Sequence, residues 1–226
     1  MLKRSKKYKE SLKLFDKSKT YSLEEAVAIL KKMPSLKFDQ SLDVGIRLNV
    51  DSKKSDQLIR GTVVLPHGTG KTKRIAVFCK GEAEQQAKDA GVEIVGGQEL
   101  IDKVSGGWLD FDVAVSTPEM MRDLSKLGKV LGPKGLMPSP KTGTVTNDIA
   151  KAVNELKAGK VEFKTDKQSG IHVLVGKISF ETNKLVENIK ALVNAILASK
   201  PPSVKGNLIK SISLALTMSP GLKVTI

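Results

Sequence analysis

The stretch LPHGTGKTKRIAVFC, residues 65–79, decides how the chain is divided. Gly70, Lys71 and Thr72 match the last three positions of the phosphate-binding loop of nucleotide hydrolases. That loop also needs a glycine five residues before Gly70, where this chain has Leu65, and a helix directly after the threonine. Here an apolar strand follows instead, over 74–79. The sequence therefore argues against a nucleotide site and predicts the beginning of a buried strand.

Downstream of this stretch, strand and helix patterns alternate. Apolar strands are predicted at 74–79, 92–95 and 111–116, with helices at 82–90 and 98–104 between them. Thr117, followed by Pro118 and Glu119, is predicted to cap a further helix, and another helix is predicted over 147–159. Buried strands that alternate with helices imply right-handed crossovers and a parallel sheet. Residues 68–158 are therefore predicted to form a Rossmann-like α/β domain.

The two ends of the chain have a different pattern. Ser22 and Glu25 form a capping box for a helix that Pro34 stops, and residues 42–50 alternate apolar and polar side chains as a half-buried strand does. Further strands are predicted at 59–65, 160–166, 171–180, 209–217 and 222–226. A long helix over 183–199 is predicted to be capped by Thr182. The predicted fold class is α/β and α+β: a discontinuous α+β domain, 1–67 plus 159–226, into which the α/β domain is inserted.

The charge of the chain is concentrated in its two ends. The sequence has 38 basic and 24 acidic residues, a net charge of +14. Residues 68–158 contain 13 basic and 12 acidic residues, and the remainder contains 25 and 12. Such an excess favours a polyanionic partner, and with only nine aromatic residues we expect phosphate and shape contacts rather than extensive base stacking. The eight basic residues among the first 20 are either a solvated tail or an arm that binds nucleic acid.

Several other classes of site are disfavoured. Cys79 is the single cysteine and is expected to be a core residue, while His67 and His172 have no neighbours at ligand spacing, so no metal site is predicted. The segment FCKGEAE lacks the three spaced glycines of a dinucleotide site, so no cofactor and no catalytic residue are predicted. No apolar run approaches the roughly 18 residues of a membrane span, and we expect a cytoplasmic protein. His67 is expected to be structural, and His172 to be either an RNA contact or an exposed strand residue.

The segment GKVLGPKGLMPSPKTGTV, residues 128–145, is the least regular part of the chain. Its prolines lack amide donors and its glycines allow left-handed backbone, so we expect no regular secondary structure there. One interpretation is a rigid structural loop. The other is a contact with phosphate or with a partner through Lys129, Lys134 and Lys141.

The chain resembles the ribosomal protein L-one family over essentially its whole length. Among the segments that carry this resemblance are 128–145, VEFKTDKQSGIHVLVGKISF (161–180) and TMSPG (217–221). The resemblance implies two domains, one discontinuous and one inserted. It also implies binding to the stalk of large-subunit ribosomal RNA near the tRNA exit site, and help in releasing deacylated tRNA. It further implies repression of the chain's own messenger RNA through a mimic of the ribosomal site, and a monomer when free of the ribosome.

The resemblance also assigns candidate RNA contacts to nine positions: Lys37, Phe38, Asp166, Lys167, Ser169, His172, Thr217, Met218 and Ser219. The family usually has glycine where this chain has Ser219, which puts the closeness of that contact in question. Phe38 could instead be a core residue and Asp166 an ordinary turn residue. Pro66, Gly68, Gly70 and Gly159 are predicted to form a hinge between the domains.

Two other functions remain open from the sequence. One is a nucleotide-dependent enzyme that uses the inserted domain, although its fingerprint residues are missing. The other is a general basic chaperone or a basic protein that binds nucleic acid without specificity, which the net charge alone would allow.

Overall fold

The computed structural model describes residues 5–34, 36–51, 54–204 and 206–225. The chain divides into two compact units, one made of the residues up to Gly70 and from Gly159 onwards, the other of Lys71–Ala158. The strands of the first unit pair in antiparallel fashion, whereas the inserted unit contains a parallel sheet. The mixed α/β architecture expected from the sequence is thus present.

The first unit is built on a four-stranded sheet in the order β7-β1-β8-β9. Its strands are β1 (Ser41–Leu48), β7 (Gly170–Lys177), β8 (Ile209–Leu216) and β9 (Leu222–Val224). Alternate residues of β1 are buried, from Leu42 to Leu48, as the period of two predicts. Strand β1 lies between β7 and β8 and pairs with both, so the first and last thirds of the chain share one sheet.

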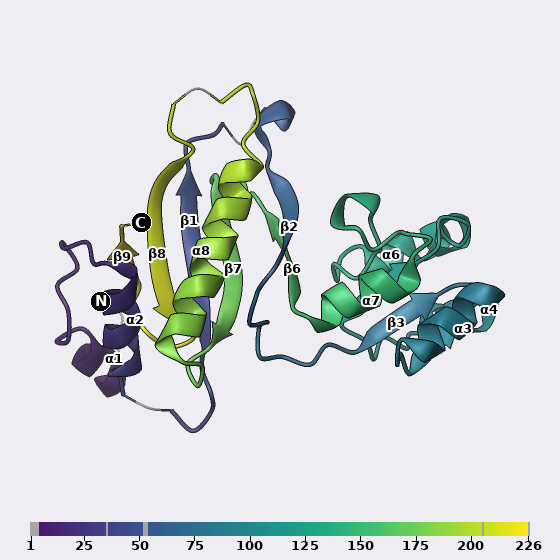
Figure 1. The fold of residues 1–226 in the computed structure, drawn as a ribbon, viewed down its shortest axis with the longest axis horizontal. Coiled ribbons are helices and arrows are strands. Elements are labelled where there is room, and N and C mark those ends of the chain that lie inside the picture. The colour runs from purple at the N-terminus through teal and green to yellow at the C-terminus, as the bar shows by residue number, and fades with distance from the viewer. Residues whose placement is uncertain (1–4, 35, 52–53, 205, 226) are drawn as a thin grey trace. The chain divides into compact units, whose positions relative to one another are not determined.

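Two helices cover one face of this sheet. Helix α2 (Leu23–Lys31) begins at the predicted capping box, in which Ser22 and Glu25 bond each other's backbone amides. Helix α8 (Thr182–Ala198) lies across β7 and contacts α2 (Figure 1). Their apolar faces and the buried side of the sheet form one core, which leaves the other side of the sheet exposed. The short helix α1 (Lys6–Ser11) precedes them and is capped by Ser5.

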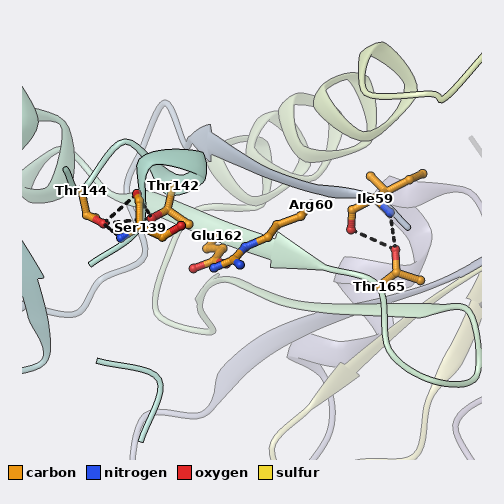
Figure 2. Close-up of polar contacts among 7 residues, drawn as sticks. All are labelled: Ile59, Arg60, Ser139, Thr142, Thr144, Glu162 and Thr165. Atoms are coloured by element: carbon orange, nitrogen blue, oxygen red, sulfur yellow. Dashed lines mark hydrogen bonds and ion pairs between the residues drawn. The ribbon is translucent and has the colours of Figure 1, made fainter. Parts of the chain in front are cut away.

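A separate two-stranded ribbon completes the first unit. It pairs β2 (Arg60–Val64) with β6 (Lys160–Lys164), and a 3-10 turn, η1 (Ser55–Gln57), precedes it. The hydroxyl of Thr165 both accepts from the amide of Ile59 and donates to its carbonyl, and the side chains of Arg60 and Glu162 form an ion pair across the ribbon (Figure 2).

The inserted unit contains a three-stranded parallel sheet in the order β4-β3-β5. The strands are β3 (Ile75–Phe78), β4 (Ile94–Gly96) and β5 (Val113–Ser116). Its main helices are α3 (Glu82–Asp89), α4 (Gln98–Ser105) and α7 (Ile149–Lys157). All four residues of β3 are buried, and apolar clusters lie on both faces of the sheet, as expected when helices cover a parallel sheet on both sides.

Three local predictions were wrong. Thr117 makes no cap: the next helix, α5 (Met121–Leu124), begins later and has no side-chain cap hydrogen bond. Thr182 is the first residue of α8 instead of its cap, because Glu181 occupies the cap position. The segment 128–145 also contains short helical turns, α6 (Gly128–Leu131) and η3 (Pro140–Thr142), in addition to η2 (Ser125–Leu127) just before it.

Candidate nucleic-acid interface

The candidate residues near positions 38 and 218 lie together, although about 180 residues separate them in sequence. Two residues of the first segment hold them there. The side-chain oxygen of Gln40 accepts from the amide of Met218 at 3.3 Å, and Gln40 itself is buried. The amide of Ser41 donates to the hydroxyl of Thr217 at 3.1 Å, and the amide of Thr217 donates back to the carbonyl of Ser41. These contacts form one end of the sheet.

Two large apolar side chains project into solvent at this end. Phe38 is 51% exposed and Met218 is 65% exposed, and Lys37 beside them is also exposed. The interpretation of Phe38 as a core residue is therefore wrong. Exposed large apolar side chains of this kind on a basic unit are suited to contact riboses or bases of an RNA.

Ser219 does not need the backbone freedom of a glycine. Among the described residues, Ser169 is the one non-glycine residue with a positive φ, so Ser219 adopts an ordinary conformation. Its hydroxyl accepts from the amide of Leu216 at 2.8 Å and donates to the carbonyl of Pro220 at 3.0 Å. The side chain is thus half-buried and directed at its own turn, where it fixes the backbone next to Met218.

The candidates Asp166, Lys167 and Ser169 form a tight turn between β6 and β7. One carboxylate oxygen of Asp166 accepts from the amides of Gln168 at 2.8 Å and Gly170 at 2.6 Å. Ser169 has a left-handed φ of 62°, and its hydroxyl donates to the carbonyl of Val50 at 2.8 Å. Lys167 is exposed at the tip of the turn. The carboxylate therefore serves to hold the turn that presents Lys167.

The electrostatics of the turn favour the charged form of Asp166. The hydrogen bond from the Gly170 amide, the bond from Gln168 and the nearby ring of His172 hold the pKa of Asp166 below its usual range. The second carboxylate oxygen lies 3.8 Å from Nε2 of His172, whose side chain is 75% exposed. His172 projects from β7 onto the exposed face of the sheet, beside the turn.

The two groups of candidates lie at opposite ends of the exposed face. Ser41 and Thr217 mark one end of β1, and Arg47 pairs with Gly170 near the other. At about 3.3 Å per residue, the strand between them spans roughly 20–25 Å, comparable to several base pairs of a helix. The structure thus brings each group together locally and places the sheet between the groups.

Further residues of the exposed face, next to the turn, were not identified from the sequence. Gly45, Arg47, Ser211 and Ser213 line a shallow hollow together with Asp166 and His172. A Cβ atom at Gly45 would lie 2.9 Å from the hydroxyl of Ser213 and 3.4 Å from the ring of His172, so a side chain there would displace the Ser213 hydroxyl. The alternation of β1 and β8 places these positions on the side of the sheet opposite the core, but it does not show that they lie beside His172.

The predicted hinge residues all belong to the first unit. Gly68 has a φ of 65° and its amide donates to the carbonyl of Leu65, which closes a turn after Pro66. Gly70 has a φ of 71° and lies against Lys177 and Phe180. Gly159 has a φ of 102°, and a Cβ atom there would lie 2.5 Å from Cα of Gly68. Glycine is suited to the left-handed backbone at all three positions, and at Gly159 it also permits close packing against another backbone segment.

A buried asparagine, which the sequence analysis missed, fixes the turn. Asn188 of α8 has no exposed surface. Its side-chain oxygen accepts from the amide of His67 at 3.1 Å, and its nitrogen donates to the carbonyls of Gly68 at 3.0 Å and Val175 at 2.8 Å. The ring of His67 pairs with Glu187 at 2.5 Å, which is consistent with the structural role expected for it.

The structure offers no support for the alternative sites. The strand β3 begins at Ile75, so no helix follows Thr72 as a phosphate-binding loop would require. Cys79 is buried, as predicted, and burial raises the pKa of its thiol to about 11. Within the described residues, no group of three or more metal-ligating side chains occurs, and none of the helices there is long and apolar enough to cross a membrane.

Comparison with known proteins identifies the family. Residues 30–220 match the model of the ribosomal protein L1p/L10e family. The chain is 56% identical over 220 residues to the large ribosomal subunit protein uL1 of Protochlamydia amoebophila, covering 97% of this chain and 93% of that protein. It is 53% identical over 223 residues to the protein of the same name from Onion yellows phytoplasma, covering 99% and 97%. The chain therefore belongs to the ribosomal protein L1p/L10e family.

Proposed function

We propose that this chain is a component of the large ribosomal subunit that binds a stalk of large-subunit ribosomal RNA through its first unit. The relatives quoted above are named as large-subunit ribosomal proteins, and they match nearly the full chain. Because the family consists of ribosomal proteins, the prediction that the chain is not an enzyme is confirmed. The nucleotide-dependent enzyme considered from the sequence is thereby excluded.

The observation that carries this proposal is the exposed face of the four-stranded sheet, with candidate contacts at both of its ends. The face belongs to the unit that holds almost the whole net charge of the chain, since Lys71–Ala158 contains only one excess basic residue. Apart from Leu174, the side chains of β1 and β7 on this face are small or polar, so a folded RNA could approach the backbone closely. A wide, shallow RNA groove with its 2′-hydroxyls is suited to such a surface.

Each group of contacts has a distinct chemical role in this proposal. At one end, Phe38 and Met218 supply apolar contact, and the hydroxyl of Thr217 can bond a 2′-hydroxyl. At the other end, Lys167 neutralises phosphate on a turn that Asp166 holds, and His172 offers a ring nitrogen beside it. In this proposal Asp166 does not contact phosphate itself. Its carboxylate holds the turn that positions Lys167, which explains why a carboxylate lies close to a phosphate-binding lysine.

We further propose that the chain represses its own translation and assists tRNA release, as the family resemblance implies. The same face would bind a mimic of the ribosomal site on the chain's own messenger RNA and so repress its translation. On the ribosome, the chain would assist the release of deacylated tRNA near the exit site. The free protein would be a monomer.

The first test compares single variants at the exposed apolar positions. We expect Met218→Ala and Phe38→Ala each to weaken binding to the large-subunit stalk RNA by about 1–2 kcal/mol, or five- to thirtyfold, as truncation of central contacts does. Their high exposure means that folding should be unaffected. Leu197→Ala is the matched control, because Leu197 is 47% exposed on the helix side of the sheet. Equal affinities for all three variants would refute the proposed face.

A second test separates specific from general binding. A specific stalk binder should retain its RNA in the presence of excess bulk tRNA, whereas a general basic protein should lose it. The logarithm of affinity should also fall with the logarithm of salt concentration by about 0.9 for each phosphate neutralised on a duplex. Complete displacement by bulk tRNA would favour the general binder.

A further inference from the structure

A basic segment lies in the inserted unit, and the remainder of that unit has a net negative charge. Residues 124–147 contain four lysines and no carboxylate. The rest of Lys71–Ala158 contains nine basic and twelve acidic residues, a net charge of −3. The near-neutral total for this unit therefore conceals a separation of charge along the chain: 124–147 is one basic segment, and 71–81, with four basic residues and no carboxylate, is another.

Three of these lysines are accessible to a binding partner. Lys129, Lys134 and Lys141 are exposed, and among the described residues none of them lies in a salt bridge. The fourth, Lys126, pairs with Asp123 at 3.1 Å. Each of the three can therefore pair with an anionic partner such as a phosphate group.

The segment that carries them is fixed by its own packing. Leu131 is fully buried, and Leu136 and Met137 pack against the same apolar cluster, so alternate parts of the segment are anchored while the lysines face water. Gly135 has a left-handed φ of 70° in the turn next to Lys134, and its amide donates to the carbonyl of Gly132.

Hydroxyl groups fix the end of the segment next to Lys141. The hydroxyls of Thr142 and Thr144 lie 2.9 Å apart, and both donate to the carbonyl of Ser139 (Figure 2). The hydroxyl of Thr144 also accepts from the amide of Ser139 at 2.8 Å. Thr144 then continues into a bridge that joins the segment to the last residue of β5. A surface held in this way loses little conformational entropy on binding, apart from that of the lysine side chains.

We propose that Lys129, Lys134 and Lys141 form a second RNA contact, which binds the phosphate backbone independently of the first unit. Lysine acts as a point charge toward phosphate, so this contact adds affinity without sequence specificity. The RNA would be either the ribosomal stalk or tRNA, since both present the same phosphate chemistry. The choice of RNA as the partner rests on the proposed function, whereas the charge and the exposure of the three lysines do not depend on it.

Lysine footprinting on the full chain tests this directly. The protein is acetylated with and without RNA, and the modification of each lysine is measured by mass spectrometry. One arm uses the large-subunit stalk RNA and the other deacylated tRNA. We expect at least a threefold loss of reactivity at Lys129, Lys134 and Lys141 in one arm or both, which identifies the source. Exposed lysines elsewhere in the same unit, Lys88, Lys103 and Lys151, should remain unchanged.

The same experiment separates failure of this inference from failure of the proposed function. Protection at Lys37 and Lys167 without protection of Lys129, Lys134 and Lys141 would overturn the inference and leave the proposed function intact. Protection of these three lysines alone would support the inference and count against the proposed face. Equal protection of these three lysines and of the three control lysines would mean that RNA binds the unit nonspecifically, and would overturn the inference. The absence of protection by either RNA would also overturn it.

A charge-neutral variant provides a second readout. The triple variant Lys129→Gln, Lys134→Gln, Lys141→Gln should lower the slope of log affinity against log salt by about 0.9 for each lost phosphate contact. The control variant Lys88→Gln, Lys103→Gln, Lys151→Gln changes the net charge of the unit equally and should leave the slope unchanged. Equal slopes for both triple variants would contradict the proposed contact.

Discussion

Replacing Asn188 with leucine should destabilise the first unit by about 3 kcal/mol. The side chain is fully buried and makes three hydrogen bonds, to the backbone of His67, Gly68 and Val175. Each contributes about 1 kcal/mol net, and leucine of similar size fills the space without replacing any of them. The carbonyl of Val175 would also lose a buried partner. The loss should therefore exceed that of an ordinary surface substitution several times over.

The two units must be observed separately, because a chain of two units need not unfold in one step. Trp108 is the single tryptophan and lies in the inserted unit, so its fluorescence reports that unit alone. Hydrogen exchange measured on peptides of β7 and α8 reports the first unit. With increasing urea, Asn188→Leu should shift the exchange transition and leave the tryptophan midpoint unchanged.

Asn194 provides the matched control, since it lies on the same helix but is exposed. Asn194→Leu should change the free energy of unfolding by less than about 0.5 kcal/mol. The reasoning fails if Asn188→Leu costs less than about 1 kcal/mol, or if the two leucine variants behave alike.

Three further outcomes are expected. Gly159→Ala should destabilise the first unit by about 2–3 kcal/mol in urea unfolding, because its Cβ would overlap the backbone of Gly68; Gly107→Ala, with a φ of 97° and nothing within 4 Å, should cost only about 1 kcal/mol. The thiol of Cys79, buried and with a pKa near 11, should not react with a disulfide reagent at pH 8 until the inserted unit unfolds; rapid labelling of the native protein would contradict its burial. The pKa of Asp166 is lowered, so its contribution to the turn is present at neutral pH and is lost only as the pH falls below the ordinary aspartate range. The amide shifts of its two partners should move there by NMR, and Asp166→Asn should abolish that movement.

Much of the fold follows from local patterns in the sequence. The capping box at Ser22 and the period of two over 42–50 each correspond to an element at the expected place. Both depend on interactions within a few residues, which a single sequence records directly. The cap of α8 was misassigned because Glu181 and Thr182 are both polar, and the sequence does not show which of them leaves the helical conformation.

The site could be predicted only in part, since its geometry depends on distant pairings. The residues around 38 and 218 were identified from the family resemblance, but their proximity results from β1 pairing with β8. Local pattern carries no information about such a register. Gly45 and Ser213 were missed for the same reason, because their closeness exists only across the sheet.

Asn188 illustrates a signal that was available and not used. It lies between Leu185 and Leu192 on the apolar stripe of α8, where a polar side chain is unusual. A buried amide is tolerated only if it is hydrogen-bonded, so its position alone indicated a backbone partner. The partner itself, the turn at 67–68, could not be deduced without the fold.

The exposed face of the sheet has a consequence for the life of the protein before it reaches RNA. A bare sheet face lined by apolar side chains would promote self-association, whereas the hollow in this face is lined mostly by serines, glycines and charged groups. The short edge strand β9 is also covered, because Tyr21 bonds to Lys223 and Thr225 beside it. Both features disfavour pairing between free chains through this sheet. The repression of translation proposed above would draw on such unassembled copies, since only a chain whose face is free of ribosomal RNA could bind its own messenger RNA there.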